Sequence, residues 1–125
     1  MEPRDVARQY AAGRVALGAA LVIAPRRLGR VWLGRDGAGT GSVALRALGA
    51  RDIVLGGIAL HTLDNPQVGP RWQRTCAAVD AVDLVATAAA RPKLPPVGSA
   101  LVMAMAAAGA AVGGWLGQAL HPPEA

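Results

Sequence analysis

Six ionisable side chains interrupt otherwise apolar stretches of this 125-residue chain, three basic and three acidic. They are Arg14, Arg46, Arg51, Asp52, Asp80 and Asp83. Charged side chains within long apolar helices usually face one another or a water-filled cavity, because an unpaired charge in a low-dielectric interior is costly. The equal numbers of the two signs therefore predict internal ion pairs. Such a cluster could either hold helices together or transfer a proton.

The carboxylates bear on the choice between these two roles. Asp80 and Asp83 are three residues apart, which places them on one helix face with Cys76 and Thr87. Two close carboxylates in a low-dielectric site resist ionising together, so one of them could hold a transferable proton. No second relay group is evident. Ion pairs that fix helix order and register are therefore the favoured interpretation, and a proton path through Asp80 and Asp83 is the alternative.

Four helical segments are predicted to position these side chains, over residues 5–24, 42–63, 70–90 and 97–120. Prolines mark the edges of these segments, at Pro25, Pro66 and Pro92. The last segment is uncharged and exceeds the roughly 20 residues needed to cross a bilayer, so we expect it to span a membrane. A charge at a helix centre costs about 2.5 to 3.5 kcal/mol on insertion, so the other three segments need partners there. The sequence thus predicts an all-α fold, one four-helix transmembrane bundle over residues 1–125.

Helix geometry suggests which charges meet. In an antiparallel hairpin, positions equidistant from the turn lie at the same height. A turn at Asn65-Pro66 places Arg51 level with Asp80, and Arg46 near the level of Asp83. Because Arg46 lies only one turn into its helix, the alternative is that its long side chain extends to the membrane interface.

The first two segments give a further pair. A turn near Leu33 places Arg14 opposite Asp52. Arg51 and Asp52 are adjacent, and successive helix positions turn by about 100 degrees. Arg51 can therefore face the third helix while Asp52 faces the first, so the six charges form a single internal set.

Composition narrows the class of protein. Hydrophobic residues make up 53% of the chain, aromatics only 3%, and there are 16 glycines, which favours close approach between membrane helices over a bulky soluble core. The mean hydropathy of +0.33 is low for a multi-pass membrane protein. The net charge of +5 is spread over the chain without aromatic platforms, so we expect no nucleic-acid binding. Its densest group, Arg26, Arg27 and Arg30, suits anionic lipid headgroups.

Other motifs point to little chemistry. The stretch 34–42 is rich in glycine like a phosphate loop, but it lacks the lysine and the preceding strand. We expect a flexible connection there, with Ser42 as the N-cap of the next helix. His61 and His121 are isolated from each other and from Cys76, so neither a metal nor a cofactor is expected.

Helix 97–120 carries a pattern of small residues. Gly109, Gly113 and Gly117 recur every four residues, a spacing that lets helices pack closely. Packing within the bundle is the favoured interpretation, whereas packing between protomers is the alternative. A homo-oligomer or another membrane-protein partner therefore stays open.

Several blocks together resemble a known kind of protein. They are Gly13-Arg14 leading to Ala24-Pro25, Arg46-Ala-Leu-Gly-Ala-Arg51-Asp52 followed by Gly56, and Asp80-Ala-Val-Asp83-Leu84. These resemble blocks in small uncharacterised four-helix integral membrane proteins that are common in GC-rich bacteria. The resemblance extends to about Pro92. It implies a multi-pass protein of the bacterial inner membrane and no particular activity.

Basic residues near the helix ends suggest an orientation. Arg26, Arg27, Arg30 and Arg35 share one side with Arg91 and Lys93, against four arginines on the other side. By the positive-inside rule, the Arg26–Arg35 loop is expected in the cytoplasm and both termini outside.

Three classes of function are compatible with the sequence. The favoured one is a non-enzymatic membrane protein, a structural or accessory subunit, because internal pairing accounts for the charges. The second is a proton-coupled or solute-permeation protein that uses Asp80 and Asp83. The third is a membrane enzyme, for which His61 is the one histidine on these helices, the residue type best suited to act as a base near neutral pH.

Overall fold

The computed structural model describes residues 1–121, which are almost entirely helical. The elements are α1 (Pro3–Ile23), α2 (Pro25–Leu33), α3 (Arg35–Ala38), α4 (Gly41–His61), α5 (Gly69–Ala90), the 3-10 turn η1 (Arg91–Lys93) and α6 (Pro96–Ala119). No strand occurs among these described residues. The predicted all-α class is therefore confirmed. Residues 122–125, the end of the predicted domain, lie outside the described part.

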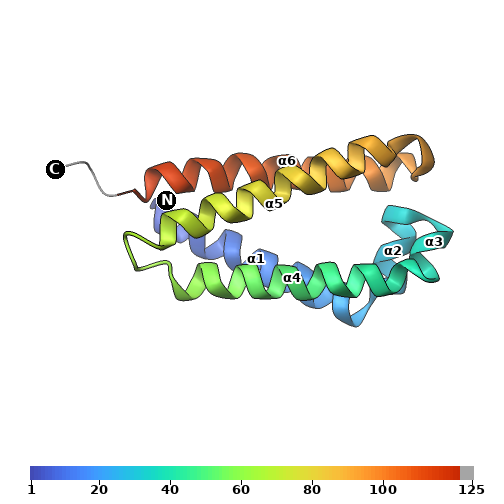
Figure 1. Cartoon of the computed structure of the whole chain (residues 1–125), viewed down its shortest axis with the longest axis horizontal. Coiled ribbons are helices and arrows are strands. Elements are labelled where there is room, and N and C mark those ends of the chain that lie inside the picture. The colour runs from blue at the N-terminus through green and yellow to red at the C-terminus, as the bar shows by residue number, and fades with distance from the viewer. Residues whose placement is uncertain (122–125) are drawn as a thin grey trace.

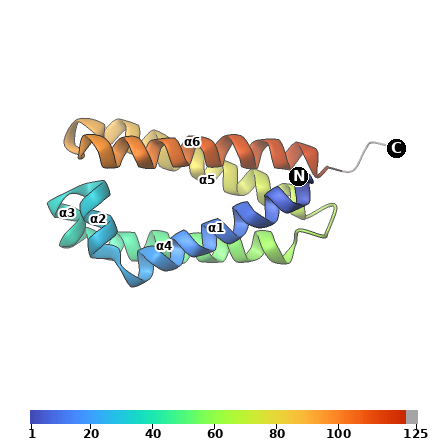
Figure 2. The same ribbon diagram turned by 180° about the vertical axis from the view of Figure 1, so that it is seen from behind.

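The four long helices run alternately up and down as two pairs (Figure 1). Helix α1 packs along α4 and α5 along α6, and each pair makes closer contact within itself than with the other pair. The N-terminus, the α4–α5 connection and the end of α6 lie at one end, called here the terminal end. Helices α2 and α3 and the α5–α6 connection lie at the other, the α2 end (Figure 2).

Glycines allow the close contact within each pair. A Cβ atom added to Gly49 of α4 would lie 2.5 Å from the backbone oxygen of Gly18 on α1, and the reverse substitution meets the same obstacle. On α6, a Cβ at Gly113 would lie 3.0 Å from the backbone oxygen of Gln73 on α5. The predicted packing of the α6 glycines within the chain is therefore confirmed.

The segment between the first two long helices differs from the prediction. Instead of a flexible connection over 34–41, α2 and α3 form two short helices, and α2 begins at Pro25, a position where the missing proline N–H costs nothing. Ser42 lies inside the first turn of α4 rather than capping it. The cause is a tertiary contact, because Gly29 and Gly37 touch backbone to backbone with no room for a Cβ on either.

One helix of the described residues, α6, is long and apolar enough to cross a membrane by length and composition. Only 17% of its apolar window is buried inside the protein. The charges in α1, α4 and α5 lower their hydropathy below that of a simple membrane span. By length and composition, therefore, one of the four predicted transmembrane helices is a candidate membrane span.

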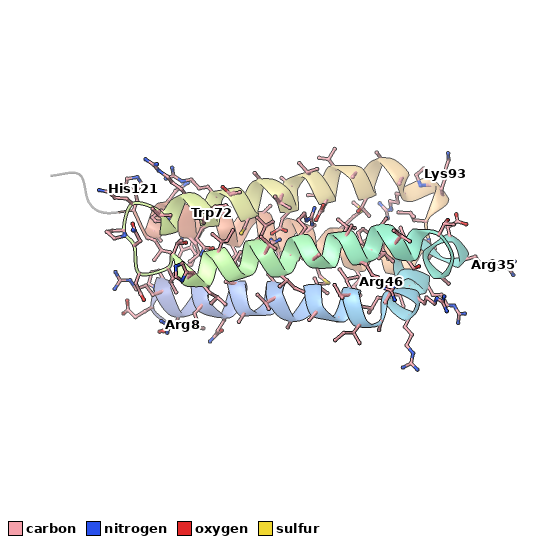
Figure 3. The ribbon with its side chains drawn as sticks, turned by 60° about the horizontal axis from the view of Figure 1, so that its bottom comes forward. Arg8, Arg35, Arg46, Trp72, Lys93 and His121 are labelled. Atoms are coloured by element: carbon pink, nitrogen blue, oxygen red, sulfur yellow. The ribbon has the colours of Figure 1, made fainter. Side chains whose placement is uncertain are left out.

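The long helices carry their charges in an unusual place. In α1 after Arg8, in α4 after Arg46, and in α5 after Arg74, every Asp and Arg side chain is buried or half-buried. Exposed charged side chains gather at the two ends, with Arg8 at the terminal end and Arg35 and Lys93 at the α2 end (Figure 3). The middle of the bundle is therefore charged inside and uncharged outside.

Candidate functional site

The buried charges meet at the middle of the bundle. Arg14, Asp52 and Asp80 lie near the centres of α1, α4 and α5, and all three are buried. Half-buried Arg51 and Asp83 adjoin them. Together with a tyrosine from α1, they form what we call the central charge cluster. Its members are Tyr10, Arg14, Arg51, Asp52, Asp80 and Asp83.

Arg14 bridges three helices. Its Nη1 donates to Asp52 Oδ1 at 3.0 Å, and its Nη2 forms a close ion pair with Asp80 Oδ2. Only 8% of the Arg14 surface is exposed. The predicted pairing of Arg14 with Asp52 is confirmed. The same guanidinium also pairs with Asp80, the carboxylate that the sequence analysis predicts for Arg51.

Arg51 pairs differently from the prediction. Its Nη1 and Nη2 donate to the two oxygens of Asp83 at 3.0 and 2.6 Å, and Nη2 also lies 3.2 Å from Asp52 Oδ1. The expected pair between Arg51 and Asp80 is therefore wrong. Height along a hairpin places the two residues level with each other, but the rotation of α5 turns Asp80 toward Arg14 on α1 and leaves Asp83 to Arg51.

Arg46 does not join the cluster. It is exposed near the α2 end, where its Nε donates to the backbone oxygen of Val22 at 3.4 Å (Figure 3). The predicted pair with Asp83 is wrong, because Arg51 occupies both oxygens of that carboxylate. The side chain instead lies outside the cluster, as the alternative for this residue required.

Tyr10 also belongs to the central charge cluster, although the sequence analysis did not predict it as a site residue. Its hydroxyl donates to Asp80 Oδ2 at 2.5 Å and accepts from Arg14 Nη2 at 3.0 Å. The backbone oxygen of Gly109 lies 3.1 Å from the same hydroxyl. Tyr10 precedes Arg14 by four residues and so shares its helix face, which was the available signal. Gly109 fits because any side chain there would overlap the Asp80 carboxylate.

A cavity of about 460 Å³ lies beside the central charge cluster, between the two helix pairs. The cluster forms its polar side. Apolar side chains from four helices form the rest, including Leu17, Leu21, Trp32, Leu48, Leu101 and Met105. Because Leu28 and Trp32 of α2 line it, the cavity extends from the middle of the bundle toward the α2 end.

Hydrogen bonding inside the cluster is incomplete. Asp52 Oδ2 and Asp80 Oδ1 accept no hydrogen bond from the described residues, although only 7% and 8% of these two residues is exposed. Arg14 Nε is buried and also lacks an acceptor within the described part. The formal charge is negative, because three carboxylates face two guanidinium groups. The cluster is thus well paired but has carboxylate oxygens to spare.

The other candidate residues lie apart from the cavity. His61 is exposed at the last residue of α4, whereas Cys76 is fully buried with Ala11 and Ala59. Within residues 1–121, no group of three or more His, Cys, Asp or Glu side chains is placed to hold a metal ion.

The predicted headgroup residues share one side of a short helix. Arg26, Arg27 and Arg30 are exposed on α2, while Pro25 and Gly29 of the same helix are buried. The helix is therefore amphipathic, with its basic side turned away from the bundle.

This arrangement suits two tasks. Arg14 and Arg51 each engage two carboxylates from different helices, which cross-links α1, α4 and α5. The neighbouring cavity combines apolar walls with unused acceptors, which is the composition of a small-molecule site. Comparison of the chain with protein-family models, with curated proteins and with solved structures found no match.

Proposed function

We propose that this chain is a small multi-pass membrane protein that folds as a four-helix transmembrane bundle. The central charge cluster fixes the order and register of its helices from inside, and the protein serves as a non-enzymatic structural or accessory subunit. One observation carries this proposal. Between the two charged ends, the charged side chains face inward and the outer surface is uncharged.

That distribution is the reverse of what water favours. A helix on the surface of a soluble protein turns its charged face outward and its apolar face to the core. Here Val54, Val82 and Val85 are 58%, 65% and 68% exposed, while Asp52 and Asp80 are buried. A continuous apolar belt of this kind is costly in water, whereas it matches the hydrocarbon of a bilayer.

The dimensions of the belt agree with this placement. In α5, Arg74 and Arg91 bracket the uncharged outer surface, a separation of about 26 Å at a rise of 1.5 Å per residue. The hydrocarbon core of a bilayer is about 30 Å thick, and arginine side chains can extend to the headgroups to cover the difference. Arg46 lies on the outside near the α2 end, where such an extension is possible.

Helix α2 supports an interfacial position for that end. Its exposed arginines suit the anionic headgroups of one leaflet, and its buried side packs on the bundle. With Arg35, Arg91 and Lys93, this is the more basic end, so we place it in the cytoplasm. The resemblance to small four-helix proteins of the bacterial inner membrane agrees with a multi-pass membrane placement.

The membrane placement predicts the behaviour of the protein on extraction. After washing of membranes with alkaline carbonate, most of the protein is expected in the pellet, because four buried spans resist release. The measurement is the fraction pelleted, with a known peripheral protein as the released control. Recovery of most of the chain in the supernatant would refute the four-span bundle and favour a soluble or peripheral one.

The orientation predicts the labelling of two introduced cysteines. In a Cys76→Ala background, Gly39→Cys at the α2 end should react with a membrane-impermeant thiol reagent only after the cells are permeabilised. Gln67→Cys, in the α4–α5 connection at the opposite end, should react in intact cells. Both positions are exposed, so accessibility within the protein is matched. The opposite labelling pattern would reverse the topology.

A second candidate function is solute binding or permeation that involves Asp80 and Asp83. The observation that favours it is the cavity beside the central charge cluster, which purely structural cross-links would not need. The α1–α4 pair contacts the α5–α6 pair less extensively than the two helices of each pair contact each other. The two pairs could therefore also separate. An accessory subunit would instead be expected to copurify with a partner in mild detergent.

A further inference from the structure

We propose that the cavity beside the central charge cluster binds a hydrophobic organic monocation, which enters sideways between α1 and α6. The inference rests on the membrane placement and on the second candidate function above. It adds the chemical class of the ligand and its route of entry.

Charge favours a cation over an anion. The central charge cluster contains three carboxylates and two guanidinium groups, so the charged side of the cavity is formally −1. Arg14 and Arg51 are already engaged by two carboxylates each. An anion would have to displace one of these carboxylates and leave it stranded in an apolar site, whereas a cation completes the neutralisation.

The accessible atoms favour the same sign of charge. Asp52 Oδ2 and Asp80 Oδ1 accept no hydrogen bond from the described residues. Both oxygens keep some solvent-accessible surface. They can therefore be reached from the cavity. Arg14 Nε also lacks a partner, but it has almost no accessible surface and offers nothing to an anion. Two reachable carboxylate oxygens on buried residues form the recognition point.

The side chains at the rim of the cavity indicate that the ligand is largely apolar and by which route it enters. Leu17 on α1 and Leu101 and Met105 on α6 line the cavity and are 38%, 53% and 47% exposed. Gly13 of α1 also lines the cavity and is exposed, with nothing within 4 Å of the place where a Cβ would be. The cavity is thus open between α1 and α6, on the uncharged belt. A ligand that arrives there comes from the hydrocarbon and must itself be hydrophobic.

Two ions of matched shape provide the test. Tetraphenylphosphonium and tetraphenylborate differ mainly in the sign of their charge. Equilibrium dialysis against the purified protein in a non-ionic detergent should give saturable binding of the phosphonium at one per chain, and binding of the borate at least about tenfold weaker. Equal uptake of both ions, or phosphonium uptake that does not saturate, would mean partition into apolar surface and would overturn the proposal. Preference for the borate would overturn it too.

Two glycine variants locate the binding. Gly13→Trp should abolish saturable phosphonium binding, because the indole fills the mouth of the cavity. Gly57→Trp on α4 is the matched control, since its Cβ also meets nothing within 4 Å, it is exposed, and it does not line the cavity. Full binding by the Gly13 variant would refute the lateral route. Loss in both variants would refute the location.

A charge variant tests the recognition point. Asp80→Asn keeps the shape of the side chain and should weaken phosphonium binding about tenfold or more, and a folded variant with unchanged binding would contradict the proposal. Circular dichroism and gel filtration establish that the variant is folded. Carbonate extraction tests the membrane placement separately. A chain that stays in membranes but does not discriminate the two ions refutes only this inference.

Discussion

Replacement of Arg14 with leucine is expected to lower the stability of the bundle by about 3 to 5 kcal/mol, the cost of breaking a buried ion pair. Arg14 is buried and holds Asp52 and Asp80 from two other helices, so its loss leaves Asp80 without its cation in an apolar interior and leaves Asp52 paired with Arg51 alone. The Tyr10 hydroxyl also loses its donor. Thermal unfolding in detergent, followed by circular dichroism, measures the effect.

Arg46→Leu is the matched control for this prediction. It is the same substitution in an exposed arginine whose one hydrogen bond to the described residues is to the backbone oxygen of Val22, so little change in stability is expected. A second comparison is Arg14→Leu combined with Asp52→Asn and Asp80→Asn, which removes the stranded charges and should recover part of the loss. Equal effects of the Arg14 and Arg46 substitutions would show that the central charge cluster does not support the fold.

Two glycine to alanine substitutions in α4 are expected to change stability in opposite directions. Gly49→Ala should destabilise by about 1 to 3 kcal/mol, since its methyl group would lie 2.5 Å from the Gly18 backbone oxygen and 2.9 Å from Leu21 Cβ. Gly57→Ala should stabilise by about 0.5 to 1 kcal/mol, because its Cβ has open space and alanine is the better helix former.

The pair of variants is informative because residue type, substitution and helix are the same. Thermal unfolding of both proteins in one detergent, with the unaltered chain beside them, gives the two signs directly. Destabilisation by both substitutions to a similar degree would mean that α1 and α4 do not approach as closely as the structure has them. A stabilising Gly49→Ala would contradict the contact outright.

Local signals in the sequence were sufficient for the long helices. The predicted segments 5–24, 42–63, 70–90 and 97–120 match α1, α4, α5 and α6 within two residues at each boundary, because prolines and charges mark helix ends chemically. The short helices α2 and α3 were not predicted. They depend on the contact between Gly29 and Gly37, which a reading of 34–42 as a flexible glycine-rich connection could not include.

Of the charge pairs, one was predicted correctly from the sequence and another depended on the tertiary structure. Arg14 and Asp52 were paired correctly from their height on α1 and α4, two helices that pack along their length. Arg51 was assigned to Asp80 on height alone, although Asp83 one turn away was equally within reach of its long side chain. The rotation of α5 about its axis decided between them, and α5 packs along α6 with Asp80 against Gly109.

The sequence by itself determined the helical class, the helix boundaries and the presence of an internal set of charges, because each depends on periodicity, proline and charge along one segment. Only the tertiary structure decided the membership of Tyr10, the exclusion of Arg46, the uncharged outer belt and the cavity beside Asp80. These features depend on which face each helix turns to its neighbours. Helix rotation is fixed by contacts between segments distant in the chain, such as Gly18 with Gly49, and such contacts leave no mark within either segment alone.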